Sequence, residues 1–294
     1  MEILVLGTSA TKPLPREGCR CPICVSKDKK DRRMRSSILI ACEKRNPHLR
    51  RGVCECAHAN VLIDCGPDIK LQIENCKLSA RGGSALGGKI ENLKGIFITH
   101  AHQDHIAGLK KIVRSSLRAD PRSPKSMSRE NLLLYISKID AKILGKKLLS
   151  QFRLKIIKPY QKIKINNLIF QPIPIIHPGS KSTFAFKVIR NKFVIRRVIY
   201  MPDYKRVPKK SLKYFKNIDL LIVGGSSLER KLPWHATIKE TIDFFTRFGG
   251  RAPKKIYFTH IGHRTLPHRE LVKWVKREGG KNFDICFDGQ RIRV

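Results

Sequence analysis

The stretch GIFITHAHQDH at residues 95–105 decides the fold, because an apolar run stops abruptly at a cluster of groups that can bind a metal. Gly95–Thr99 has the composition of a buried strand, and Ile106–Ser116 is typical of a helix. Four potential ligands lie between them: His100, His102, Asp104 and His105. Neutral imidazoles and a carboxylate suit zinc, manganese or iron, and burying them without partners would be costly. The spacing therefore predicts a metal site on a strand-to-helix loop.

The motif His-x-His-x-Asp-His behind an apolar strand resembles that of the metallo-β-lactamase superfamily, and the resemblance extends over nearly the whole chain. It implies an α/β (α+β) fold, a four-layer αββα sandwich with the metals at one edge of its two sheets. The remaining ligands of the superfamily are a His, a bridging Asp and a final His, each after a later strand. The sequence offers them in that order: His177 after Ile173–Ile176, Asp203 after Val198–Met201, and His260 after Ile256–Thr259.

Carried over position by position, the resemblance implies a centre of two zinc or manganese ions. The ligands of one ion would be His100, His102 and His177. Those of the other would be Asp104, His105 and His260, with Asp203 as the bridge. Two metals roughly 3.5–4 Å apart can share a hydroxide and clamp the attacking and departing oxygens of a substrate. We therefore expect a metal-dependent hydrolase that uses this activated hydroxide, with Asp104 among its catalytic residues.

Three cysteines lie close together near the N-terminus: Cys19, Cys21 and Cys24. Three thiolates need a fourth ligand to close a tetrahedral zinc site, and a free surface cluster is the alternative. Within the superfamily, this C-x-C-x-x-C loop resembles that of the phosphodiesterases of phosphonate breakdown, which cleave a ribose cyclic phosphate. There the fourth ligand follows the last active-site His by three residues, which implies His263 here. The loop at 16–26 would then hold one structural zinc.

Other short motifs match the same branch of the superfamily, among them Gly7-Thr8-Ser9 near the N-terminus and Phe287-Asp288-Gly289 near the C-terminus. His235, in Leu232-Pro233-Trp234-His235, occupies the place where these enzymes carry a His near the scissile phosphate. The resemblance implies a catalytic group that donates to the phosphate or to the leaving oxygen. The alternative is a His at a helix start with no chemical role. His268 also precedes a predicted helix, and we assign no role to it.

The charge of the chain is strongly positive, with 61 Lys and Arg against 23 Asp and Glu and a formal net charge of +38. Such a surface attracts polyanions, which favours a nucleic acid or a phosphorylated substrate as partner. Compositional drift toward basic residues is the alternative, because the charge is spread along the whole sequence. The nine cysteines, the lack of a signal segment after Met1 and the absence of a long apolar run lead us to expect a cytoplasmic protein without a transmembrane segment.

The organisation predicted from the sequence is a single domain over residues 1–294, since no linker or repeat divides it. A basic insertion at 42–58 contains Cys42, Cys54 and Cys56, whose irregular spacing favours a solvated loop over a further zinc site. Helices are expected at Asp140–Phe152, with Asp140 as N-cap, and at Thr237–Phe248. The apolar face of the second would comprise Ile238, Ile242 and Phe245.

Several functions remain open at this stage. The cysteine loop favours a phosphodiesterase that acts on a small cyclic or nucleotide-like phosphodiester. The charge favours a ribonuclease or tRNA-processing endonuclease, although His235-Ala236-Thr237 lacks the Glu of a His-Glu-Ala-Thr-like motif. A thioester or lactam hydrolase and a basic RNA-binding protein without turnover are further alternatives. A homodimer is compatible with each of them.

Overall fold

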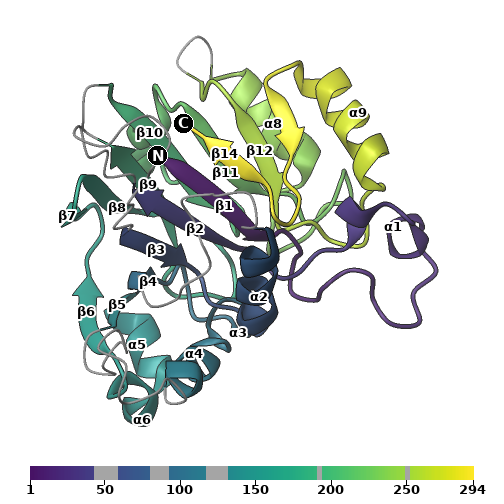
Figure 1. The fold of residues 1–294 in the computed structure, drawn as a ribbon. Helices are drawn as coiled ribbons and strands as arrows, with labels where there is room; N and C mark the ends of the chain where they lie inside the picture. The colour runs from purple at the N-terminus through teal and green to yellow at the C-terminus, as the bar shows by residue number, and fades with distance from the viewer. Residues whose placement is uncertain (43–58, 80–92, 117–131, 191–193, 249–251) are drawn as a thin grey trace, which may run out of the picture.

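Two sheets packed face to face form the centre of the molecule (Figure 1). The computed structural model describes residues 1–42, 59–79, 93–116, 132–190, 194–248 and 252–294. In spatial order, the first sheet contains β14 (Arg291–Arg293), β1 (Glu2–Gly7), β2 (Ser37–Cys42), β3 (Ala59–Ile63), β4 (Leu93–Phe97), β5 (Leu133–Ser137) and β6 (Arg153–Ile157). The second contains β13 (Phe283–Ile285), β12 (Ile256–Thr259), β11 (Leu220–Gly224), β10 (Arg196–Met201), β9 (Phe184–Arg190), β8 (Leu168–Pro174) and β7 (Ile163–Ile165).

Helices cover the outer faces of both sheets (Figure 1). Those on the first sheet are α2 (Ile69–Ser79), α3 (Gln103–Ile106), α4 (Leu109–Ser116), α5 (Lys138–Leu144) and α6 (Lys146–Leu149). Those on the side of the second sheet are α1 (Pro22–Val25), α7 (Lys209–Leu212), α8 (Ile238–Thr246) and α9 (His268–Gly279), with 3-10 turns η1 (Lys29–Asp31) and η5 (Lys213–Phe215). None of the helices in the described ranges is both long enough and apolar enough to span a bilayer.

The four layers follow from strand residues that alternate between two buried faces. Along β1, Ile3 and Val5 enter the core between the sheets, whereas Leu4 faces the helices outside the first sheet. In the central core the ring of Phe97 stacks on that of Phe170 from the opposite sheet, with 4.6 Å between ring centres. The predicted four-layer αββα sandwich is therefore confirmed.

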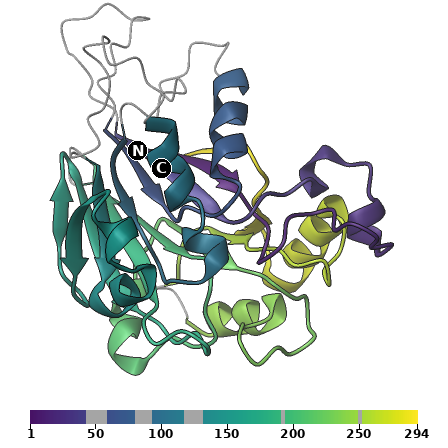
Figure 2. The same cartoon turned by 90° about the horizontal axis from the view of Figure 1, so that it is seen from below.

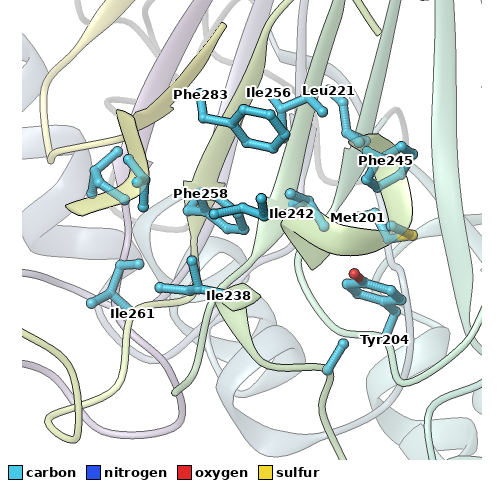
Figure 3. Close-up of a cluster of buried hydrophobic side chains, with 14 of the residues drawn as sticks. Met201, Tyr204, Leu221, Ile238, Ile242, Phe245, Ile256, Phe258, Ile261 and Phe283 are labelled. Carbon is cyan, nitrogen blue, oxygen red and sulfur yellow. The ribbon is translucent and has the colours of Figure 1, made fainter. Parts of the chain in front are cut away.

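Helix α8 packs on the second sheet through the apolar face predicted from the sequence. Figure 3 shows Ile238, Ile242 and Phe245 among strand residues such as Leu221 and Phe258. The helix begins at a capping box, in which the side chains of Thr237 and Glu240 bond each other's backbone N–H. This cap fixes the start of the helix directly after the segment that carries His235.

The predicted helix at Asp140–Phe152 is wrong in its extent, because the segment forms two helices, α5 and α6. Gly145 separates them with a φ of +78°, a conformation that glycine adopts without steric cost. The N-cap is Ser137, whose side chain accepts a hydrogen bond from the backbone N–H of Asp140. A serine at the end of a strand thus takes the capping role that we assigned to Asp140.

Segments from the two ends of the sequence lie side by side. Strand β14 pairs with β1, so the two termini are close together in Figures 1 and 2. The motifs Gly7-Thr8-Ser9 and Phe287-Asp288-Gly289 also meet, since Thr8 Oγ1 donates to Asp288 Oδ1 over 2.7 Å. Cys42 is the last residue of β2. The rest of the predicted insertion, with Cys54 and Cys56, lies outside the described residues.

Candidate metal centres

Parallel strands bring the predicted ligands to one edge of the sandwich. Strands β3, β4 and β5 run parallel in the first sheet, and β10, β11 and β12 run parallel in the second. The segments after β4, β8, β10 and β12 carry the predicted ligands of the metal pair, with Asp104 and His105 in the short helix α3. Because the carboxyl ends of parallel strands meet at the same edge, side chains far apart in the sequence converge there.

The first group of candidate ligands comprises His100, His102 and His177, whose ligand atoms lie within 4.8 Å of one another. His102 Nδ1 is 2.9 Å from His100 Nε2 and 3.3 Å from His177 Nε2. The opposite ring nitrogens are held by the protein. His102 Nε2 faces the carbonyl oxygen of Gly179 at 3.3 Å, and His177 Nδ1 faces that of Trp234 at 3.0 Å. These contacts leave the other nitrogen of each ring for a metal.

The second group comprises Asp104, His105 and His260, and Asp203 lies between the two groups. Asp203 Oδ2 is 2.6 Å from His105 Nε2 and 3.9 Å from His100 Nε2. Asp203 Oδ1 is 2.9 Å from His260 Nε2. One carboxylate therefore reaches imidazoles of both groups, which is the placement expected of a bridging ligand.

Asp64, which we did not predict from the sequence, contacts His105 on the side away from Asp203. Asp64 Oδ2 lies 2.8 Å from His105 Nδ1, and Asp64 Oδ1 accepts hydrogen bonds from the backbone N–H and the hydroxyl of Thr99. Such a contact fixes the ring orientation of a metal-binding His and leaves Nε2 for the metal. The signal was present, because Asp64 follows the apolar run Val61–Ile63 just as the other candidate ligands follow their strands.

Unusual backbone conformations occur at two of these strand ends. Asp64 has a φ of +65° and His260 a φ of +54°, which non-glycine residues rarely adopt. The strain at His260 is held by the N-terminal segment, since the backbone N–H of Ile261 donates to Thr8 O over 2.7 Å. Residues in such conformations cluster at functional sites, where the surrounding structure enforces them.

The electrostatics of the cluster favour the ligand forms of most of its groups. Burial lowers the pKa of His100 well below its ordinary value and that of His177 to about 4, so both imidazoles are neutral. At His105 burial acts in the same direction, but Asp64, Asp104 and Asp203 outweigh it and raise the pKa well above the ordinary value. The pKa of Asp203 stays well below its usual range despite burial, because of His260 and His105.

The donor atoms at the centre fit divalent metal ions. His105 Nε2 and both oxygens of Asp203 are buried and make no hydrogen bond, although they lie close together. Buried polar atoms without partners are costly. The donor set of imidazole nitrogens and carboxylate oxygens is that of zinc, manganese or iron sites. An ion between these atoms would satisfy them at once.

A pocket of about 270 Å³ opens onto the cluster. Its walls are formed by Thr11, His102, Asp104, His177, Pro178, Gly179, Asp203, Trp234, His235 and His260. The predicted catalytic residue His235 is among them, with Nδ1 3.2 Å from Asp203 Oδ1. Because Nδ1 of His235 faces Asp203, Nε2 is the nitrogen that His235 can offer to a substrate.

A second candidate site forms where the predicted cysteines meet His263. The ligand atoms of Cys19, Cys21, Cys24 and His263 lie within 4.8 Å of one another. Cys19 Sγ is 3.4 Å from Cys21 Sγ and 3.5 Å from His263 Nδ1. Zn–S and Zn–N bonds of about 2.3 and 2.1 Å place tetrahedral ligands roughly 3.5–3.8 Å apart. The four side chains therefore fit a zinc ion.

The thiols of this site differ in their titration. Hydrogen bonds from Cys21 lower the pKa of Cys19, whereas burial raises the pKa of Cys24 to about 11. Cys24 Sγ also accepts a hydrogen bond from the backbone N–H of Arg16. Because metals bind the thiolate, loading this site requires Cys24 to release a proton.

Buried polar contacts anchor the segment that follows the cysteines. Arg33 is buried, and its guanidinium donates to Thr8 Oγ1, to the carbonyl oxygen of Cys286 and to His268 Nδ1. Asp31 accepts from the backbone N–H of His268 over 2.8 Å. His268, to which we assigned no role, thus joins the N-terminal loop to α9.

A family model described as "Beta-lactamase superfamily domain" matches residues 59–261. The chain belongs to the beta-lactamase superfamily. The predicted resemblance is therefore confirmed at the level of the family and the fold.

Proteins of several different names are similar to this chain. This superfamily member is 24% identical over 298 residues to an octanoyltransferase of Porphyromonas gingivalis, a match that covers 100% of the chain and 53% of the relative. The chain thus spans about half the length of that curated relative. Among solved structures, a diphosphatase from the PhnP family is 25% identical with a TM-score of 0.74, covering 99% of this chain and 96% of the other. Zinc-bound PqqB from Methylobacterium extorquens is 16% identical with a TM-score of 0.75, covering all of both chains.

The family, the fold and the clustered donors are consistent with one another, because groups able to bind divalent metals gather at one edge of a beta-lactamase superfamily sandwich. The structure brings the candidate ligands of both predicted sites together, and it also places His235 within ligand distance of His177 and Asp203. Their occupation by metals and their roles stay predictions.

Proposed function

We propose that this superfamily member is a phosphodiesterase that holds two divalent ions at the pocket and hydrolyses a small cyclic or nucleotide-like phosphodiester. The observation that carries the proposal is the position of Asp203, whose carboxylate reaches imidazoles of both ligand groups beneath the pocket. A carboxylate shared in this way is suited to hold two ions a short distance apart.

Two zinc or manganese ions bound there would supply Lewis acidity for the phosphoryl oxygens and lower the pKa of water enough for ionisation near neutral pH. The chain's own residues supply the remaining parts. Asp64 and the carbonyl oxygen of Trp234 fix the rings of His105 and His177. His235 lines the pocket and its Nδ1 faces Asp203, so a protonated His235 would donate to the departing oxygen through Nε2.

Two observations support a small substrate with a phosphoryl group. The pocket volume of about 270 Å³ lies just below the range of about 300–1,000 Å³ that is common for ligand pockets, which favours a small ligand over a large one. A similar structure is described as a diphosphatase from the PhnP family, which makes phosphoryl chemistry the first class to test for this chain. PqqB with bound zinc supports zinc as the first ion to test.

The cysteine cluster is proposed to bind one structural zinc. Its four side chains leave no ligand position for a substrate, and none of the three thiols lines the described pocket. The resulting protein would carry two ions for catalysis and one for stability. We propose a cytoplasmic location for it, because its thiols would stay reduced there.

A ribonuclease or tRNA-processing endonuclease is the second candidate, favoured by the net charge of +38. A long polyanion would gain affinity from many lysines, and that affinity would fall steeply with salt. A small phosphodiester contacts few of them. The salt dependence of kcat/KM therefore separates the two candidates, and RNA binding without cleavage would indicate the non-catalytic alternative.

The experiment is a substrate screen on the metal-loaded protein, with bis-p-nitrophenyl phosphate, 2′,3′-cyclic nucleotides and a precursor tRNA. We expect turnover of the first two substrates, lost in Asp104→Ala. Cleavage of the tRNA alone would transfer the proposal to the nuclease. Turnover of no phosphodiester, or an Asp104→Ala variant as active as the parent, would refute it.

A further inference from the structure

Trp234 lies at the candidate active-site pocket with much of its indole in solvent. The residue is 53% exposed although it lines the pocket. The chain has two tryptophans, and the other, Trp274 on α9, packs against the buried cluster beneath α8 and α9. Tryptophan offers a large flat apolar surface and is enriched where proteins meet their ligands. An exposed indole beside a candidate reaction centre therefore needs an explanation.

The exposure of Trp234 does not come from a loose backbone. Its carbonyl oxygen accepts from His177 Nδ1 at 3.0 Å, which ties the residue to the first ligand group. The next carbonyl, of His235, accepts from Lys205 Nζ at 3.1 Å, and the backbone N–H of Ala236 donates to Tyr204 O at 2.9 Å. Consecutive residues are thus held from neighbouring elements. The indole is presented on a fixed segment, so little ordering is needed when a ligand binds it.

The remaining pocket walls define which ligand fits. Most are imidazoles and carboxylates of the candidate centre, and the other apolar surface comes from Pro178, Gly179 and the methyl of Thr11. A long acyl chain would need a continuous apolar channel, which these walls do not provide. A single flat ring needs only one flat apolar surface to stack on, and the indole of Trp234 is such a surface. The net charge of +38 also favours an anionic ligand.

We propose that Trp234 stacks on the base of a nucleotide whose phosphodiester lies at the candidate metal pair, so that base-bearing phosphodiesters are preferred substrates. The inference rests on the proposed function, because that function places the phosphate at the pair. Every base has a π-face, so stacking distinguishes a substrate with a base from one without it more strongly than one base from another.

A kinetic comparison tests the stacking directly on the metal-loaded enzyme. The quantity is the ratio of kcat/KM for adenosine 2′,3′-cyclic phosphate to that for 1-O-methylribose 2′,3′-cyclic phosphate. Trp234→Leu should lower this ratio roughly 10-fold, whereas Trp234→Phe should keep most of it. Trp274→Phe is the matched control and should leave the ratio unchanged. A ratio that is the same in Trp234→Leu and in the parent would overturn the proposal.

A binding experiment gives a readout independent of turnover. In Trp274→Phe the indole of Trp234 is the sole tryptophan, so its fluorescence reports the pocket. Adenosine 5′-monophosphate should quench it in a saturable way, and ribose 5-phosphate should not. Equal effects of the two ligands, or none up to millimolar concentration, would contradict stacking. In Trp234→Phe, the emission of Trp274 should not respond to either ligand.

The two experiments separate the two proposals. Base-dependent quenching without hydrolysis of either cyclic phosphate would leave the stacking in place and refute the phosphodiesterase. Hydrolysis of both substrates with a ratio that Trp234→Leu does not change would leave the phosphodiesterase in place and refute the stacking.

Discussion

The pocket cluster and the cysteine cluster meet in one short segment, His260–His263, yet they are built from opposite chemistry. The first gathers imidazoles and carboxylates that are almost all buried, beneath a pocket. The second gathers three thiols and an imidazole, of which only Cys24 is buried. His260 serves one site and His263 the other. Two residues of chain therefore separate a site that is open to a ligand from one that its own side chains close.

The difference indicates how each site acts on the protein. Around the pocket, Asp64 and backbone carbonyls orient the rings, and a pocket wall is left for substrate. Around the cysteines, the fourth ligand comes from the distant segment that carries His263, so a metal there would join residues 244 positions apart. Loss of the first site should remove activity, and loss of the second should remove stability.

The largest effect is expected from Asp203→Ala. Removing the carboxylate that reaches both ligand groups should abolish binding of the metal pair, which contributes several kcal/mol to transition-state stabilisation. We expect kcat for bis-p-nitrophenyl phosphate to fall at least about 10³-fold. Asp243→Ala, on the surface of α8, is the control and should be as active as the parent. Residual activity within tenfold of the parent would contradict a shared carboxylate.

Cys21→Ser should act on stability instead. Loss of one thiolate would release the structural zinc, with an expected loss of at least about 3 kcal/mol in the free energy of unfolding. Thermal denaturation should show a Tm roughly 6–12 °C lower than that of the parent. The exposed neighbour provides the control, since Arg20→Ser should keep the parent Tm. A Tm unchanged in Cys21→Ser would show that the cluster holds no structural metal.

Asp64→Asn tests whether Asp64 positions His105 for metal binding in the pocket cluster. Asparagine keeps the shape of the side chain but removes the negative charge beside His105 Nδ1, so the metal affinity should fall about 10–100-fold. Activity should return when the metal concentration is raised, which a merely misfolded variant would not show. The control is Asp219→Asn, which directly precedes β11 and lies at the opposite end of the second sheet from the ligands. A loss that excess metal does not restore would refute the positioning role.

The smallest effect concerns the buried contact between Arg33 and His268, in the segment that follows the cysteine cluster. Burial, assisted by Arg33, lowers the pKa of His268 to about 4, whereas an unfolded His titrates near 6.5. The unfolded chain therefore binds the proton more readily between these values, and stability from this group is lost as pH falls through that window. His268→Gln removes the titration and keeps an acceptor for Arg33. From pH 7 to pH 5 the parent should lose about 2 kcal/mol relative to the variant.

Thermal denaturation of both proteins at the two pH values measures this difference, and activity at pH 7.5 should be alike in both. The parent must be compared with the variant because Asp288 changes the stability with pH in the opposite direction to His268. Burial raises the pKa of Asp288 to about 7, so its contribution to stability falls as pH rises from about 4 to 7. A parent and variant whose Tm values shift equally would show that His268 is not held neutral.

How far the sequence predicts the molecule depends on the range of each interaction. The candidate ligands were predictable because each follows an apolar strand, and parallel strands carry their ends to one edge. Asp64 follows the same rule but was missed, because its role depends on the orientation of His105 and not on a spacing in the sequence. The anchor between Arg33 and His268 joins residues 235 positions apart, and no local pattern announces it.

Local backbone preferences account for the other difference. The periodic apolar pattern of 140–152 predicts one helix, but Gly145 adopts a positive φ and divides it. The same preference is overridden at His260, where a non-glycine residue takes a positive φ because the N-terminal segment holds it. Local backbone preference thus explains where the surface helix breaks, and tertiary contacts explain the backbone conformation at the candidate site.

The measurement that tests the two-site account most directly is the metal content of purified protein, determined by elemental analysis of the parent, Asp203→Ala and Cys21→Ser. The account predicts about three ions per chain in the parent, about one in Asp203→Ala and about two in Cys21→Ser. A parent that binds one ion, or two variants that lose the same ion, would contradict it.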